Sequence, residues 1–128
     1  MRNVSLLTIL VMVFVGLLNP IARGDETGEQ PWSVGYDEAD ITPAPGQVQM
    51  SGFGRERYAN GALAPLLTQV VVLRDGEYNT GVLITADILD FDCVMVEAIR
   101  RAIKHKHNIA PENIMLAASH THWGPAGV

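Results

Sequence analysis

Apolar and polar positions along this chain predict two neighbouring strands in its middle. Residues 67–74, LTQVVVLR, are rich in β-branched side chains, and residues 80–87, TGVLITAD, form a second apolar run after the polar segment DGEYN. Two such runs joined by a turn-forming segment predict a β-hairpin. Asp75 and Gly76 favour a turn with a positive φ, in a loop of up to five residues. Another short strand is expected around residues 32–36.

The segment after this hairpin has helical spacing. Val96, Ile99 and Ile103 recur with a period near 3.6, which predicts a helix with one apolar face. Asp90 or Asp92 is expected to act as the N-cap, because an aspartate side chain can accept hydrogen bonds from the first free backbone N–H groups of a helix.

A second strand is expected after the helix, so the order of elements predicts the fold class. Asn108 followed by Pro111 indicates where the helix stops, and residues 112–119, ENIMLAAS, predict a short buried strand. Strand, helix and strand in this order predict a right-handed βαβ unit with two parallel strands. The expected class is therefore α/β: a mixed sheet in which a β-hairpin is followed by a right-handed βαβ unit.

The first residues have the pattern of a signal peptide. Residues 4–18 are mostly apolar, too short a run to span a bilayer, and Ala22 and Gly24 fit the small residues before a cleavage point. We therefore expect residues 1–24 to be a signal peptide of a secreted or periplasmic protein, with an uncleaved anchor as the alternative. Residues 25–31 are polar and predict a flexible lead-in. About 100 residues remain, which suits one small domain.

Charge and cysteine content exclude two further possibilities. The formal net charge is −5 and no long basic segment exists, so a nucleic-acid partner has no electrostatic support. Cys93 is the single cysteine, so no internal disulfide can form; we expect it to be a small core residue.

The stretch ASHTHWGP is the strongest candidate for chemistry. His120 and His122 directly follow the last predicted strand, and Asp87 follows the parallel strand before it. Ligands of open α/β sheets bind at the carboxyl ends of strands, and two histidines at i and i+2 of an extended chain point to the same side. The pair could bind a metal ion, with Asp87 as a supporting carboxylate, or could be two polar turn residues. His105 and His107 are expected to lie near the carbonyls at the helix end.

The order of motifs resembles the N-terminal domain of the neutral and alkaline ceramidases. NIMLAASHTHWGPAG is similar to that family's strand and His-Thr-His-Ser-Gly-Pro-Gly stretch. VGYDEADITPAPG, MSGFG, VVVLRDG and VLITADIL are similar to earlier segments, so the resemblance covers residues 34–128. The chain departs from the family at Trp123, where a serine is usual, and in GALAPLLTQVVVL, which lacks charged residues common there.

This resemblance implies that residues 32–128 are the first part of a larger zinc-hydrolase domain. It implies Zn²⁺ bound through His120, a catalytic or substrate contact for His122, and a pocket mouth shaped by Trp123 and Gly124. The implied activity is hydrolysis of N-acylsphingosine or a related N-acyl lipid, with membrane-surface association through the substrate. The family's other zinc ligands, a histidine, a glutamate and a tyrosine, come from further downstream. The alternative is a non-catalytic exported binding module, or a degenerate fragment of such an enzyme.

Overall fold

The computed structural model describes residues 32–51 and 57–125, which contain four strands, one helix and one short 3₁₀ turn. In chain order these elements are β1 (Ser33–Asp40), β2 (Leu67–Arg74), β3 (Thr80–Ala86), α2 (Cys93–His107), the 3₁₀ turn (Pro111–Asn113) and β4 (Ile114–Ala118). Residues 1–31, on which the predicted signal peptide and lead-in fall, lie outside the described part of the chain.

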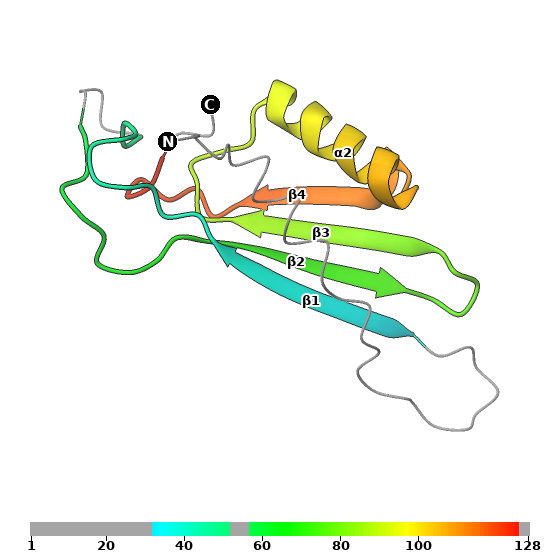
Figure 1. The fold of residues 1–128 in the computed structure, drawn as a ribbon. Coiled ribbons are helices and arrows are strands. Elements are labelled where there is room, and N and C mark those ends of the chain that lie inside the picture. The colour runs from blue at the N-terminus through cyan, green and yellow to red at the C-terminus, as the bar shows by residue number, and fades with distance from the viewer. Residues whose placement is uncertain (1–31, 52–56, 126–128) are drawn as a thin grey trace.

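The strands form one mixed sheet in the order β1-β2-β3-β4, as Figure 1 shows. β1 pairs antiparallel with β2, β2 pairs antiparallel with β3, and β3 pairs parallel with β4. The predicted hairpin and the parallel pair joined through a helix are both confirmed, so this is a small α/β domain. β1 is longer than the strand expected at residues 32–36, and it pairs with β2 along its whole length.

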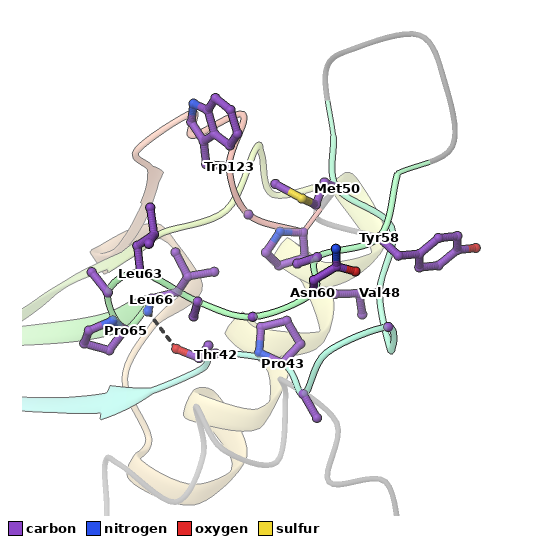
Figure 2. A pocket seen from close by; sticks show the side chains of 18 of the residues that line it. Thr42, Pro43, Val48, Met50, Tyr58, Asn60, Leu63, Pro65, Leu66 and Trp123 are labelled. Atoms are coloured by element: carbon purple, nitrogen blue, oxygen red, sulfur yellow. Dashed lines mark hydrogen bonds between the residues drawn. The ribbon is translucent and has the colours of Figure 1, made fainter.

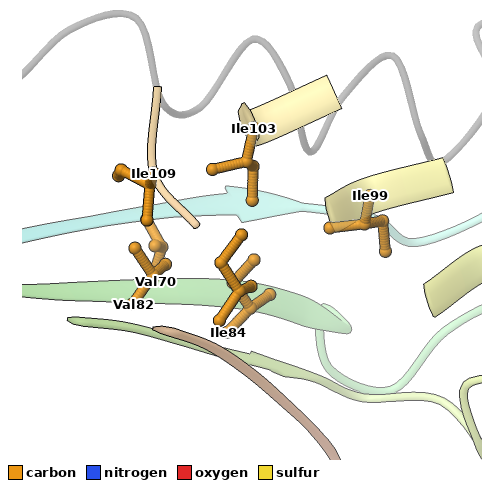
Figure 3. Close-up of a cluster of buried hydrophobic side chains, with 7 residues drawn as sticks. Val70, Val82, Ile84, Ile99, Ile103 and Ile109 are labelled. Carbon is orange, nitrogen blue, oxygen red and sulfur yellow. The ribbon is translucent and has the colours of Figure 1, made fainter. Parts of the chain in front are cut away.

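Helix α2 covers one face of the sheet and supplies the centre of the core (Figures 1 and 3). The Asp92 side chain accepts a hydrogen bond from the Met95 N–H at 2.6 Å, and Asn108 closes the helix in the left-handed conformation. Ile99 and Ile103 are buried against the sheet. The same cluster contains Val70, Val82, Ile84 and Ile114 of the sheet, and Ile109 from the connection that follows the helix. Burying one such side chain fully stabilises the fold by about 1.5–3 kcal/mol.

Two expectations about individual residues are wrong. Cys93 is exposed rather than in the core, because it is the first helical residue and lies off the stripe that Ile99 and Ile103 form. The positive φ in the hairpin loop is at Tyr78 rather than at Asp75 or Gly76. In this five-residue loop the Asp75 carboxylate accepts hydrogen bonds from the backbone N–H groups of Glu77 and Asn79, which shifts the left-handed position to Tyr78.

The sheet face opposite α2 carries exposed apolar side chains. Val34, Tyr36, Leu73, Leu83 and Met115 belong to all four strands and are exposed. A hydrogen-bonded polar row runs beside them, in which the Tyr36 hydroxyl donates to Glu38 at 2.6 Å. No described helix or strand packs on this face.

Candidate functional site

The carboxyl ends of the two parallel strands bring the predicted site residues to one edge of the sheet. Ala86 is paired with Ala118, so Asp87 and Ser119 leave the sheet side by side. The Ser119 N–H donates to the Ala86 carbonyl at 3.0 Å and continues this pairing by one step. His120 is therefore held next to the segment that follows β3, as the strand order predicts.

The backbone conformation of His120 and a hydrogen bond of its ring together set the orientation of this side chain. Its φ is 58°, a left-handed conformation in which histidine is more frequent than most residues. Its Nδ1 lies 2.9 Å from the Leu89 carbonyl oxygen, which can only accept, so Nδ1 carries the proton and donates. The Nε2 lone pair is then available for an electrophile, the arrangement usual for histidines that bind metals.

His122 lies beside His120, although the chain between them is not extended. The left-handed turn at His120 replaces the expected extended geometry, yet the two rings meet edge to face with their centroids 5.2 Å apart. His120 is exposed and His122 is half-buried. We call His120 and His122 the histidine pair.

Asp87 joins two neighbouring strands at this edge of the sheet through hydrogen bonds. Its Oδ2 accepts a hydrogen bond from the Leu67 N–H at 3.0 Å, and its own N–H donates to the Leu67 carbonyl at 2.9 Å. The carboxylate therefore ties the start of β2 to the end of β3. Among residues 32–51 and 57–125 no group of three or more His, Cys, Asp or Glu side chains is placed to hold a metal ion.

A pocket of about 580 Å³ lies next to the histidine pair. Its described walls are residues 42–50 and 57–66, between β1 and β2, and the turn after His122. Figure 2 shows Leu63 and Trp123 toward one side of the pocket and Val48 and Met50 toward the other. Trp123 and Gly124 are part of the wall, whereas neither histidine is.

Several hydrogen bonds hold the pocket against the sheet edge. The Leu66 N–H donates to Thr42 Oγ1 at 2.8 Å, drawn in Figure 2. The Ser51 N–H donates to the Gly124 carbonyl at 3.3 Å, and the Leu89 N–H donates to the Pro125 carbonyl at 3.2 Å. Leu89 thus contacts His120 through its carbonyl and the pocket wall through its N–H.

Sequence reasoning did not find the pocket walls between residues 42 and 66. This segment has no helical or strand period, and its prolines and glycines predict only a loop. One signal was present: Val48, Met50, Leu63 and Leu66 are large apolar residues within a segment that has no regular structure to bury them. The sequence could not predict the contact between His120 and the Leu89 carbonyl, because every residue type has a backbone carbonyl group.

Comparison with known proteins does not identify a family for this chain. No family model matches it, and a search of curated proteins also finds no match. In the described part of the chain, no helix has the length and apolar character needed to cross a membrane.

Proposed function

We propose that this chain carries the first part of an exported, zinc-dependent amide hydrolase site of the neutral ceramidase type. In this proposal the connection from β3 through α2 to β4 is right-handed, as nearly all such connections are. The domain would be the beginning of a larger zinc hydrolase that acts on N-acylsphingosine or a related N-acyl lipid at a membrane surface.

The observation that carries the proposal is the hydrogen bond from His120 Nδ1 to the Leu89 carbonyl. It orients the ring and leaves Nε2 for zinc, while the neighbouring His122 would contact the reacting group. A zinc ion held through His120 would supply Lewis-acid chemistry, that is, activation of water near neutral pH and polarisation of the amide carbonyl. Asp87 would support the site through the backbone that it ties together.

The described residues fit such a zinc site only in part. A catalytic zinc ion usually has three protein ligands, and the histidine pair offers two imidazoles. Within the described ranges there is no third group placed for coordination. The proposal therefore requires ligands beyond these residues, and the isolated chain should bind zinc more weakly than a complete site.

A second candidate function is a non-catalytic binding module, and the pocket favours it. The pocket lies within the usual size range of ligand sites and is lined mainly by apolar residues without using either histidine. A genomic reading frame that continues past the codon for Val128 with further His, Glu and Tyr positions would favour the enzyme. A stop codon there would favour the binding module or a fragment.

Zinc titration of the full chain at pH 7.5, where imidazole is mostly neutral, tests the role of the histidine pair. We expect His120→Asn to abolish binding, because asparagine tolerates the left-handed backbone and can donate to the Leu89 carbonyl but has no Nε2. His120→Ala should do the same, and His122→Ala should reduce affinity less.

The matched control is the double variant His105→Ala and His107→Ala at the end of α2, which should bind zinc like the parent. Circular dichroism would show that each variant is folded. Zinc binding by His120→Asn equal to that of the parent would contradict the proposal. In a longer chain that contains the missing ligands, His120→Asn should remove both zinc and amidase activity, and His122→Ala should mainly lower turnover.

A further inference from the structure

The sheet face opposite α2, which we call the open face, carries one apolar row across all four strands. Strand register aligns one side chain from each strand in this row: Tyr36, Val71, Leu83 and Met115. The neighbours of Leu83 in β3 are buried against α2, so the row lies on the other side of the sheet. Tyr36 is 50% exposed and Met115 is 64% exposed. An exposed apolar row of this width is typical of a surface that packs on another surface.

A polar row lies next to the apolar row on the same face. By register it consists of Glu38, Gln69, Thr85 and Ala117. The Thr85 hydroxyl donates to Gln69 Oε1 at 3.4 Å, and Gln69 Nε2 donates to Glu38 Oε2 at 3.4 Å. Within the four strands, the charged side chains of this face are Glu38 and Asp40, both in β1. The open face is therefore negatively charged along the β1 edge and uncharged along the β4 edge.

From this pattern we infer that two copies of the chain pack their open faces together, related by a twofold axis parallel to the strands. Such an axis places β1 of one copy over β4 of the other, so that like rows lie over like rows. Glu38 then faces the partner's Ala117, and Tyr36 faces the partner's Met115. The two β1 strands lie at opposite edges, about 14 Å apart across the sheet, which exceeds the Debye length of about 8 Å at physiological salt.

The same pattern disfavours two other arrangements of a second copy. A twofold axis across the strands would place Glu38 over the partner's Val34, which buries a carboxylate against an apolar side chain. Pairing between two β1 edges would bring together the negative charges of Asp37 and Glu38. The Glu38 N–H also already donates to Asp37 Oδ1 at 2.9 Å.

The size of the open face sets the strength of the expected dimer. Four strands about 4.8 Å apart, with about seven residues of about 3.3 Å each, cover roughly 400 Å² in plan, and their side chains present a larger accessible surface. Specific interfaces bury about 800 Å² per partner, so this face is at the lower end of the range. We therefore expect a reversible dimer with a dissociation constant on the order of 10 μM. The histidine pair follows the end of β4 and stays uncovered, whether or not it binds zinc.

Sedimentation velocity of the full chain tests whether the dimer forms. Over concentrations from about 1 μM to about 200 μM, we expect the average mass to rise from that of one chain toward that of two. The mass of a single chain at every concentration would overturn the inference.

A charge exchange between positions 38 and 117 tests the arrangement of the two copies. Ala117→Glu places a carboxylate over the partner's Glu38 and should raise the dissociation constant about tenfold or more. Adding Glu38→Lys to this variant should restore dimerisation, because opposite charges then face each other. Within one chain these positions lie on the two outer strands, about 14 Å apart, so the restoration has to act between chains. Val94→Glu, at an exposed position on α2, is the matched control and should leave the dissociation constant unchanged.

Four results would overturn the inference in folded variants, as judged by circular dichroism. Dimerisation unaffected by Ala117→Glu would place the contact on another part of the chain, such as the apolar residues 4–18. Failure of Glu38→Lys to restore it would exclude this axis. A monomer that sediments with phosphatidylcholine vesicles would show that the open face contacts a membrane. A longer chain that stays monomeric where this chain dimerises would show that a following segment covers the face.

Discussion

At the scale of single residues, the backbone at Gly124 packs closely against the backbone at Asp87, at the end of the sheet where the histidine pair lies. A Cβ built on Gly124 would lie 3.1 Å from the Asp87 carbonyl oxygen and 3.0 Å from Thr121 Cγ2. The carbonyl belongs to the residue that joins β2 and β3, so it has little freedom to move. Only glycine lets the turn after the histidine pair pack against the end of β3.

We expect Gly124→Ala to lower the free energy of unfolding by about 1–3 kcal/mol, the usual cost of forcing an extra methyl group into a packed region. Gly81→Ala is the matched control, because a Cβ there meets nothing within 4 Å and its φ is not positive. Urea unfolding of the two variants would measure the difference. Equal midpoints would contradict the close packing of Gly124.

A second prediction at this scale concerns His107 in the last turn of α2. Burial of its ring, with a smaller contribution from the positive charge of Lys106, holds the pKa of His107 below its usual 6.5. The unfolded chain therefore binds this proton at a higher pH than the folded chain does. The stability that neutral His107 provides is fully present above pH 6.5 and is lost as the pH falls toward the lowered pKa.

His107→Gln keeps a polar side chain at the same position without a titrating group. We expect the urea midpoint of the parent to fall between pH 7 and pH 5 more steeply than that of His107→Gln. Parallel curves would show that this histidine does not link folding to pH. A difference confined to pH values below 4 would belong to carboxylates such as Asp75, whose pKa is lowered by its hydrogen bonds with Asn79.

At the scale of elements, the spacing of apolar residues predicted the helix and the hairpin strands, whose positions are determined by interactions between residues close in the chain. Helix α2 begins after Asp92 and ends before Asn108, and the hairpin strands β2 and β3 lie where β-branched runs predicted them. These elements follow from spacing and capping within a few residues. Cys93 was misplaced although the same spacing contained the answer, because it does not fall on the line of Ile99 and Ile103.

Only one part of the candidate site could be predicted from the sequence: the residues that the order of the strands brings together. The order β3, α2, β4 brings Asp87 and His120 to one edge, which parallel strands require. The pocket could not be predicted, because its described walls come from residues 42–50, 57–66 and 123–125, which are far apart in the chain and lie outside the helix and the strands. Contacts such as Arg57 with Trp123 depend on tertiary packing that no local pattern encodes.

The face assignment of α2 gives a prediction at the element scale. Ile99→Asp places an unpaired charge between the helix and the sheet and should lower the free energy of unfolding by several kcal/mol, as buried charges do. Val94→Asp adds the same side chain to an exposed position in the first turn, where the helix dipole favours an acid, and should change stability by less than about 0.5 kcal/mol. Thermal unfolding would separate them, and an unchanged melting temperature for Ile99→Asp would mean that the other face packs.

At the scale of the whole molecule, the candidate functional features lie together at one end of the sheet. The histidine pair and the pocket both lie at the carboxyl ends of β3 and β4, and Leu89 hydrogen-bonds to both through its two backbone groups. The far face of the sheet instead carries Tyr36, Leu83 and Met115 in exposed positions. The end of the sheet rather than its open face therefore carries the candidate chemistry.

The last prediction concerns the mature chain. The apolar run of residues 4–18 would span about 22 Å as a helix, less than the ~30 Å of a bilayer core, and small residues follow it at Ala22 and Gly24. We therefore expect the exported protein to begin at or near Asp25, as measured by mass spectrometry of the protein from its native cell. The core clusters are built from residues 41–118, so chains beginning at Met1 and at Asp25 should have the same urea midpoint. An intact N-terminus on cytoplasmic protein would contradict export, and a lower midpoint for the shorter chain would show that the first 24 residues take part in the fold.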